Sequence, residues 1–335
     1  MLQPSGRIGP ASQKSGGTMK LRYVALALGL GAFANAAAAE YPSQTVTIVV
    51  PFGPGGSNDT VGRYLADQLS ELWGQPVVVE NRPGAGAVIG ANHVAKADPD
   101  GHTLLVSSVT FTTTPAVQQN LPYDPAEDLA PVAMLGKVPM VLGVGPSVEA
   151  TTIEEFLEIA RSRDLAYADV GPGSINQFAA ELLNEAAGLE LTPVHYSGGT
   201  EAMTDLIGGH VDLYFGTIVQ LLPTIEGGQL SGLLVTSPDR STSLPDVPTP
   251  VEAGLAEAQV EVWWGLFAPG GTPDDIINKV NADINSVLST PEAKEFLAGY
   301  GARPASLSAE EFTAHVQDEL QKWRRIAEEQ EIKAE

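Results

Sequence analysis

The sequence predicts an α/β protein made of two lobes, each built on a mostly parallel sheet, with a ligand cleft between them. A strand, a glycine-rich loop and an amphipathic helix follow one another over residues 46–74, and the same series recurs over residues 165–187. The chain has 335 residues, of which 43% are hydrophobic, which is enough for two lobes with their own cores. Glycine loops at the carboxyl ends of parallel strands are where open α/β sheets bind ligands.

The first 39 residues have the pattern of a secretory signal peptide. Lys20 and Arg22 precede an apolar run over residues 23–33, and residues 36–39 are all alanine, as at a cleavage site. We expect cleavage after Ala39, with Met19 as an alternative start of translation. The chain has no cysteine, which excludes a lipid anchor, and the apolar run is too short for a permanent membrane span. The mature protein is therefore predicted to be soluble and periplasmic.

The charge of the chain restricts its partners. The formal net charge is −23, and without the four basic residues of the leader it is −27, from 14 basic and 41 acidic residues. Such a surface disfavours nucleic acid and anionic lipid as partners. An acidic ligand would also be repelled at long range, so local dipoles and buried donors would have to hold it.

The loop after the first strand is the predicted centre of a binding site. Val46–Val50 is a β-branched, apolar run typical of a buried strand, and Pro51 ends it because proline has no N–H for the ladder. Gly53, Gly55 and Gly56 then give the backbone access to positive φ and keep it open to a ligand. Unpaired N–H groups at the start of the next helix are a natural seat for an anion.

The helix after this loop has an apolar stripe and is predicted to end at Gly74. The stripe consists of Val61, Tyr64, Leu65, Leu69 and Leu72, and Ser57, Asn58 or Asp59 is expected to cap the helix. A dinucleotide fingerprint would need glycine at Asn58, and a P-loop would need Gly-Lys-Ser/Thr, so both nucleotide motifs are excluded. Taken alone, the loop is equally compatible with an ordinary turn that binds nothing.

The rest of the chain continues the alternation of strands and helices. Strands are expected near residues 77–80, 103–106, 165–168, 192–194, 211–215, 230–236 and 260–268, and helices near residues 89–97, 152–161, 176–187 and 200–207. Residues 132–145 are expected to hold two extended pieces, broken at Gly136 and Pro139, where the chain crosses to the second lobe. The tail is predicted to be helical, with capped starts near Thr272, Thr290 and Ser308.

No catalytic or metal-binding pattern stands out. The nucleophile elbow Gly-x-Ser-x-Gly is absent, because residues 171–174 have the wrong spacing. The five histidines show no paired metal-ligand spacing. We therefore predict no enzyme activity, no cofactor and no metal. Trp263 is equally compatible with stacking on a ligand and with a structural place at the lobe junction. Arg82 would either reach an anion or, as we prefer, fix its own loop.

From residue 41 to the C-terminus, about 295 residues, the chain resembles the TctC, or Bug, family. This family comprises the extracytoplasmic solute receptors of tripartite tricarboxylate transporters. The motifs are Val-Val-Pro-Phe-Gly-Pro-Gly-Gly at residues 49–56, Val-Val-Val-Glu-Asn-Arg-Pro-Gly-Ala-Gly at 77–86, Leu-Pro-Tyr-Asp-Pro at 121–125, Val-Asp-Leu at 211–213 and Leu-Pro-Asp-Val-Pro-Thr at 244–249.

The resemblance implies a periplasmic-binding-protein (Venus flytrap) fold with two Rossmann-like lobes that close on a small carboxylate. The ligand would be a di- or tricarboxylate, an aromatic acid or a related organic acid. The partners would be the large and small membrane subunits of the permease, and the receptor is expected to be a monomer. We expect residues 40–141 to form the first lobe and residues 142–232 the second. Residues 233–335 would hold the return crossing and C-terminal helices.

The resemblance also carries ligand contacts over by position. In the first lobe they are Phe52, Gly53, Pro54, Gly55, Gly56, Ser57, Asp59, Ser107 and Ser108. In the second lobe they are Gly171, Gly173, Ser174, Gln177, Ser197, Thr200, Gly216 and Thr217, with Trp263 at the junction.

Five positions depart from the family pattern, all of them in the second lobe. Asp169 and Pro172 stand where small or amide residues are usual, and Gln177, Ser197 and Gly216 replace a frequent His, Lys and Asp. The identity of the ligand's far end therefore stays open. Two other functions also stay open: a receptor that presents its closed form to a sensor kinase and, more remotely, a periplasmic enzyme acting on an organic acid.

Overall fold

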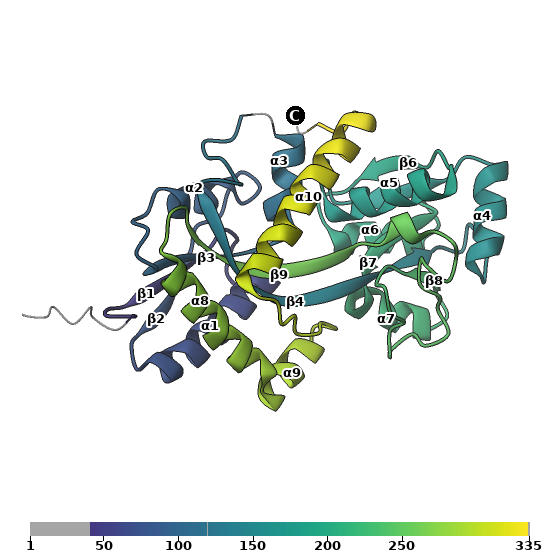
Figure 1. The fold of residues 1–335 in the computed structure, drawn as a ribbon. Coiled ribbons are helices and arrows are strands. Elements are labelled where there is room, and N and C mark those ends of the chain that lie inside the picture. The colour runs from purple at the N-terminus through teal and green to yellow at the C-terminus, as the bar shows by residue number, and fades with distance from the viewer. Residues whose placement is uncertain (1–40, 119, 334–335) are drawn as a thin grey trace, which may run out of the picture. The chain divides into compact units, whose positions relative to one another are not determined.

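The computed structural model describes residues 41–118 and 120–333, so the predicted leader lies outside the described residues. Strands and helices alternate along residues 42–333, as Figure 1 shows. The elements are β1 (Val46–Val50), α1 (Ser57–Trp73), β2 (Val77–Asn81), α2 (Val88–Ala95), β3 (Thr103–Ser108), α3 (Thr110–Val117), β4 (Leu129–Val144), α4 (Ile153–Ser162), β5 (Ala166–Asp169), α5 (Ile175–Ala187), β6 (Thr192–His195), α6 (Gly199–Ile207), β7 (Leu213–Thr217), α7 (Ile218–Glu226), β8 (Ser231–Val235), η1 (Ala256–Ala258), β9 (Glu261–Pro269), α8 (Asp274–Ser289), α9 (Pro291–Ala298) and α10 (Ala309–Glu329). None of these helices combines the length and apolar character that a membrane span requires.

The strands form two halves that meet at a shared pair of long strands. The order is β2-β1-β3-β9-β4-β7-β5-β6, and β8 also pairs with β4. The first lobe contains β1 parallel to β2 and β3, and the second contains β5 parallel to β6 and β7. The predicted pair of α/β lobes is therefore confirmed. The residue limits that we gave for the lobes stay a prediction.

Strand β4 is the crossing between the lobes, and it is not broken as predicted. Its residues 129–139 pair with β9, and its residues 140–144 pair with β7 and β8. Register shifts near Pro131 and Gly136 absorb the irregular residues as bulges, and Pro139 is the last residue to face β9. The prediction of two separate pieces was wrong. A bulge lets the strand of 16 residues continue past Gly136, and Pro139 lies where β4 changes partner from β9 to β7.

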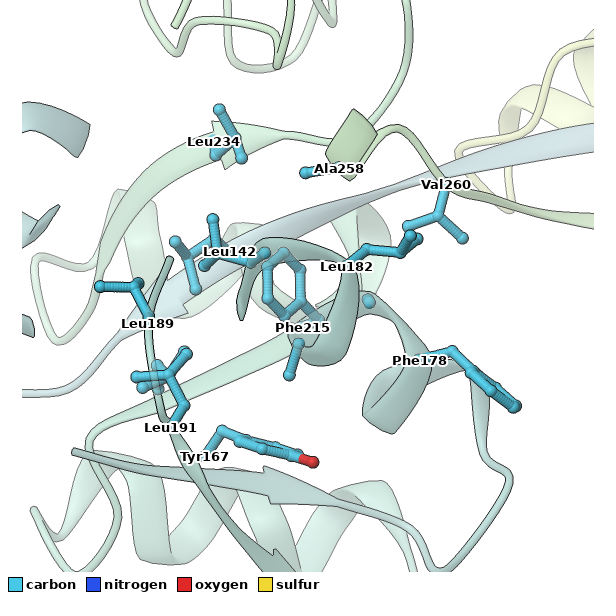
Figure 2. Packing of buried hydrophobic residues seen from close by; sticks show 14 of the residues in the cluster. Leu142, Tyr167, Phe178, Leu182, Leu189, Leu191, Phe215, Leu234, Ala258 and Val260 are labelled. Atoms are coloured by element: carbon cyan, nitrogen blue, oxygen red, sulfur yellow. The ribbon is translucent and has the colours of Figure 1, made fainter. Parts of the chain in front are cut away.

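The long C-terminal helix α10 belongs to both lobes. Phe312, Val316 and Leu320 pack into the core of the first lobe, with residues of β3 and β9. Further along the same helix, Trp323 and Ile326 pack into the core of the second lobe, part of which Figure 2 shows. In Figure 1, α10 lies across β9 in yellow. The sequence predicted a helical tail here, but not that one helix would link the two cores.

Two described helices escaped prediction, and one apolar position was misplaced. Helix α3 contains Pro115 and a run of threonines, and α7 contains Pro223, so neither has strong helix propensity. Tertiary packing stabilises them instead, as for Phe111 of α3, which stacks on Phe267 with ring centroids 4.1 Å apart. Leu72 was expected on the buried stripe of α1 but is 51% exposed.

All three predicted helix starts in the tail are confirmed, two of them with a side-chain cap. Thr290 caps α9, and Ser308 forms a complete capping box with Glu311 at the start of α10. Helix α8 instead starts after Pro273 without a side-chain cap. The N-cap position is occupied by Pro273, which has no side-chain acceptor, and the hydroxyl of Thr272 donates to the carbonyl of Pro269.

Candidate functional site

The loop between β1 and α1 leaves the start of a helix open. Gly56, and not Ser57, Asn58 or Asp59, occupies the N-cap position, and no side chain caps the helix. The first helical hydrogen bond runs from Thr60 N–H to the Gly56 carbonyl at 2.9 Å. Within the described residues nothing accepts a hydrogen bond from the backbone N–H groups of Ser57 and Asn58. This exposed end of α1 can therefore receive an anion.

Asp59 supports this loop from inside. Its carboxylate is buried and accepts hydrogen bonds from Gly55 N–H at 2.9 Å, Asn81 Nδ2 at 2.8 Å and Arg63 Nε at 3.0 Å. The hydrogen bond from Arg63 lowers the pKa of Asp59 to about 2, against the opposing effect of burial. Asn81 also donates to the carbonyl of Phe52 at 3.0 Å. Since both carboxylate oxygens already have protein partners, we assign Asp59 to support of the loop.

Arg63 and Asn81 were missed by the sequence prediction. Arg63 lies four residues after Asp59 on the same helix, which is the spacing of an intrahelical ion pair and was a usable signal. No local pattern marks Asn81, because only the pairing of β1 with β2 brings it under the loop. Together they compensate the charge of Asp59 beside the open helix start.

The other predicted contacts of the first lobe lie close to this loop. Gly53 and Pro54 are exposed and Phe52 is half-buried. Ser107 and Ser108 end β3, the strand next to β1, and both are buried, at 1% and 6% exposure. The hydroxyl of Ser108 is 3.1 Å from that of Thr110. The loop thus lies between the ends of β2 and β3, the two neighbours of β1 in the sheet.

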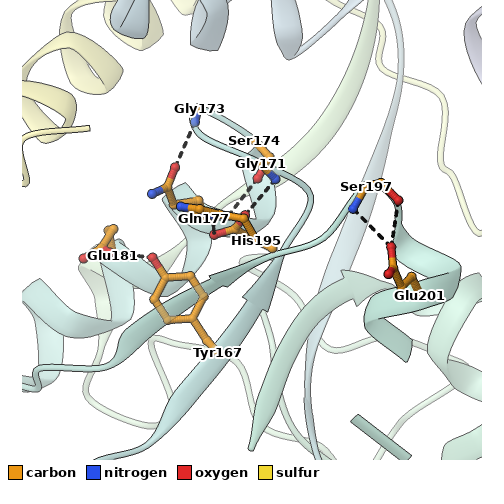
Figure 3. A network of polar contacts seen from close by, with 10 residues as sticks. Tyr167, Gly171, Gly173, Ser174, Gln177, Glu181, His195, Ser197 and Glu201 are labelled. Carbon is orange, nitrogen blue, oxygen red and sulfur yellow. Dashed lines mark hydrogen bonds and ion pairs between the residues drawn. The ribbon is translucent and has the colours of Figure 1, made fainter. Parts of the chain in front are cut away.

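The turn between β5 and α5 is held by its own side chains, as Figure 3 shows. Gly171 N–H donates to Asp169 Oδ1 at 2.7 Å, and Gly173 N–H donates to Gln177 Oε1 at 2.8 Å. Ser174 is the N-cap of α5 and accepts from Gln177 N–H at 3.4 Å. The buried Asp169 also contacts His195 Nδ1 at 2.8 Å. The N–H groups of Gly171 and Gly173 are therefore used by hydrogen bonds within the turn, which stabilise the turn itself.

The next two loops of the second lobe lie beside this turn. Ser197 donates from its hydroxyl and its N–H to Glu201 Oε2, at 2.7 and 3.3 Å, and Thr200 is exposed in the first turn of α6. Gly216 is buried under α7, where an added Cβ would lie 2.0 Å from a methyl group of Leu221, so a larger residue fits only if that side chain shifts. Thr217 is the N-cap of α7. Sequence reasoning missed Glu201, which no family motif marks.

The carboxyl ends of the two sets of strands reach the same crossing. Trp264 of β9 pairs with Ser108 on one side and with Gly136 on the other. Four residues after Gly136 on β4, Met140 pairs with Thr217. At the usual rise of a strand, Gly136 and Met140 are roughly 13 Å apart. In addition, an added Cβ on Gly173 would lie 2.6 Å from Val117 of α3, so the second-lobe turn touches the first lobe. The fold thus gathers the predicted loops of both lobes around one crossing.

Trp263 does not belong to this group. Its side chain is 1% exposed, and its indole N–H donates to Glu319 Oε2 at 2.9 Å. The rings of Phe312 and Phe267 pack against it. Its position favours the structural interpretation over stacking on a ligand.

A cluster of charged groups surrounds Glu319 beside the crossing. Thr112 Oγ1 of α3 donates to Glu319 Oε2 at 2.8 Å, and His315 Nε2 is 3.7 Å from Oε1. Burial raises the pKa of Glu319 and lowers that of Lys322. A cavity of about 400 Å³, whose lining includes His315, Glu319, Lys322, Lys137 and Trp263, contains none of the predicted loops.

His315 makes stability sensitive to acid. Burial, and then the charges of Lys137 and Lys322, lower the pKa of His315 from 6.5 to about 4. The unfolded chain therefore binds a proton at this histidine more readily than the folded protein does. The free energy of unfolding does not depend on His315 above pH 6.5, and it falls as the pH drops towards 4, by about 1.4 kcal/mol per pH unit at most. Glu319 acts in the opposite sense because its pKa is raised. We expect His315→Gln to gain stability relative to the parent as the pH falls through this window, measured by urea unfolding. A constant difference between the two proteins would contradict this.

Comparison with known proteins agrees with the two-lobed α/β fold. The family model described as the tripartite tricarboxylate transporter family receptor, TctC, matches residues 61–332. Protein BugT of Bordetella pertussis is 36% identical over 303 residues, covering 89% of this chain and 93% of BugT. This family is one of solute-binding receptors and not of enzymes.

Two similar solved structures hold carboxylates. The R. palustris protein Rpa4515 with adipate is 33% identical, with a TM-score of 0.73, and covers 88% of this chain and 99% of its own. MatC from Rhodopseudomonas palustris with bound malate is 35% identical, with a TM-score of 0.69, and covers 85% of this chain and 99% of its own. With its family-model match and its relatives of similar length, the chain belongs to the TctC family of tripartite tricarboxylate transporter receptors.

Proposed function

We propose that this protein is a periplasmic receptor that captures a small organic acid at the crossing and delivers it to a tripartite tricarboxylate transporter permease. One carboxylate of the ligand sits at the open start of α1. The loops after β3, β5, β6 and β7 complete the site. The family's receptor role and the carboxylates bound in two similar structures support the class of ligand.

The observation that carries this proposal is the uncapped, exposed start of α1. The N–H groups of Ser57 and Asn58 have no acceptor within the described residues, and the Ser57 hydroxyl stands beside them. Helix dipole and backbone donors hold an anion without a lysine or arginine. The N–H of Gly55, in the loop before the helix, is already used by Asp59, so we place the seat at the first turn of the helix.

A thermal-shift screen over carboxylic acids tests the proposal. An acid present at a hundred times its dissociation constant should stabilise the protein by about 2.7 kcal/mol. No stabilisation by any acid would refute capture of a carboxylate. Delivery is tested separately, by uptake of the best acid in cells with and without the receptor gene. Unchanged uptake, with an altered output of a sensor kinase, would favour the signalling alternative.

The hydroxyl of Ser57 is expected to contribute modestly. Ser57→Ala should weaken binding of the best acid a few-fold, about 1 kcal/mol, as for one ordinary hydrogen bond. Added salt should not weaken binding strongly, because the seat does not depend on exposed ion pairs. Isothermal titration at low and high salt measures both effects, with Ser286→Ala on the exposed face of α8 as control. A steep loss of affinity with salt would place the carboxylate on a basic side chain instead.

A further inference from the structure

We propose that Glu201 is a specificity residue that keeps a second carboxylate out of the second lobe, so that the ligand carries a single carboxylate. This inference rests on the proposed function, because it concerns the far end of the same ligand. Glu201 lies in the first turn of α6, and Oε2 accepts both the hydroxyl and the N–H of Ser197, as Figure 3 shows. The side chain thereby occupies the start of this helix, where an anionic ligand group would otherwise be seated.

The charge of Glu201 is not compensated. No lysine, arginine or histidine in the described part of the chain forms an ion pair with it. Asp59 in the first lobe differs, because Arg63 lies 3.0 Å from its carboxylate and Asn81 donates to it. The two lobes thus present unequal surfaces: a compensated acid next to free N–H groups in the first, and an uncompensated acid in the second.

The neighbours of Glu201 make this surface more acidic. Asp205, four residues after Glu201 on α6, accepts from the hydroxyl of Tyr196 at 2.9 Å. Burial, then the hydrogen bond to Asp205 and the charges of Asp205 and Glu201, raise the pKa of Tyr196 to about 12.

The arginines of the second lobe, and Arg240 after it, are bonded elsewhere. Arg161 donates to the carbonyl of Ala187, Arg163 to that of Ser147, and Arg240 pairs with Glu252. The N–H groups of Gly171 and Gly173 serve the side chains of Asp169 and Gln177. A second carboxylate would therefore meet like charge and few free donors, whereas a neutral amide or hydroxyl meets carboxylates that can accept from it.

Matched pairs of a diacid and its monoamide, from succinate to adipate, test this inference by isothermal titration. In the parent protein, the monoamide of the best length should bind about tenfold more tightly than the diacid. Glu201→Gln should remove most of that difference by raising the affinity for the diacid, and should change the monoamide less than twofold. Glu154→Gln, an exposed acid in the first turn of α4 in the same lobe, is the matched control and should change neither.

The outcomes separate this inference from the proposed function. A diacid that binds the parent as tightly as its monoamide, or an unchanged ratio in Glu201→Gln, would overturn the role of Glu201 while leaving carboxylate capture intact. If neither member of any pair binds and the acid screen is also negative, the proposed function itself fails. Lower salt should enlarge the preference for the monoamide, since the exclusion is electrostatic.

Discussion

Gly55→Val is expected to abolish binding of the carboxylate, by more than about 100-fold, or about 2.7 kcal/mol. Gly55 has φ +88°, a conformation that a β-branched residue adopts only with strain. Relief of that strain turns the peptide, breaks the bond from Gly55 N–H to Asp59 and displaces Gly56, the N-cap of the helix that seats the carboxylate. Isothermal titration with the best acid measures the loss.

Gly271→Val is the matched control for this substitution. Gly271 has φ +81° and, like Gly55, has no atom within 4 Å of an added Cβ. Both variants should therefore lose a similar stability, about 1–3 kcal/mol, but only Gly55→Val should lose binding. If Gly55→Val binds like the parent, the carboxylate is seated elsewhere.

Trp323→Ala is expected to destabilise the protein by about 3–5 kcal/mol, the largest effect on stability that we predict. The side chain of Trp323 is fully buried, and its ring centroid lies 4.9 Å from that of Phe178 of α5. Trp323 packs into the core of the second lobe, and other residues of α10 pack into the first, so this side chain anchors the helix that joins the two cores. Urea unfolding followed by tryptophan fluorescence and by circular dichroism measures the change.

Leu72→Ala on the exposed face of α1 is the control for that measurement. With 51% of its surface exposed, Leu72 should contribute less than about 0.5 kcal/mol. A loss below about 1 kcal/mol for Trp323→Ala would contradict the assignment of α10 as a link between the lobes. Separate transitions for the two lobes in the variant, with one transition in the parent, would support it.

The regular parts of the fold were readable from the sequence because local signals agreed with tertiary packing. The apolar run Val46–Val50 with Pro51 after it fixed β1, and Gly74 ended α1 in the left-handed conformation, with φ +62°. Helix α3 was not readable, because its threonines and Pro115 oppose a helix and only packing against α10 and β9 stabilises it. The continuity of β4 likewise depends on bulges within β4 itself, which form only when it pairs with β9.

The candidate site divides in the same way. Its loops were found because glycines after a strand mark a backbone that a ligand can approach, and their gathering at β4 follows from strand order. The roles of the acidic side chains that set the charge of the site were harder to predict. The role of Asp59 or Glu201 towards a ligand depends on which hydrogen-bond donors lie beside its carboxylate. For Asp59 one of these donors is Asn81, which is brought there only by the pairing of β1 with β2. Sequence alone could not show that one acid is compensated and the other is not.

A crystal structure of the protein saturated with the acid that ranks first in the thermal-shift screen tests the central claim most directly. The account predicts a ligand carboxylate oxygen within about 3 Å of the N–H of Ser57 or Asn58, directly or through one water. It also predicts that the loops after β5 and β6 cover the ligand's far end. A carboxylate bound instead to a lysine or arginine, as in the cavity that contains Lys137 and Lys322, would contradict the account.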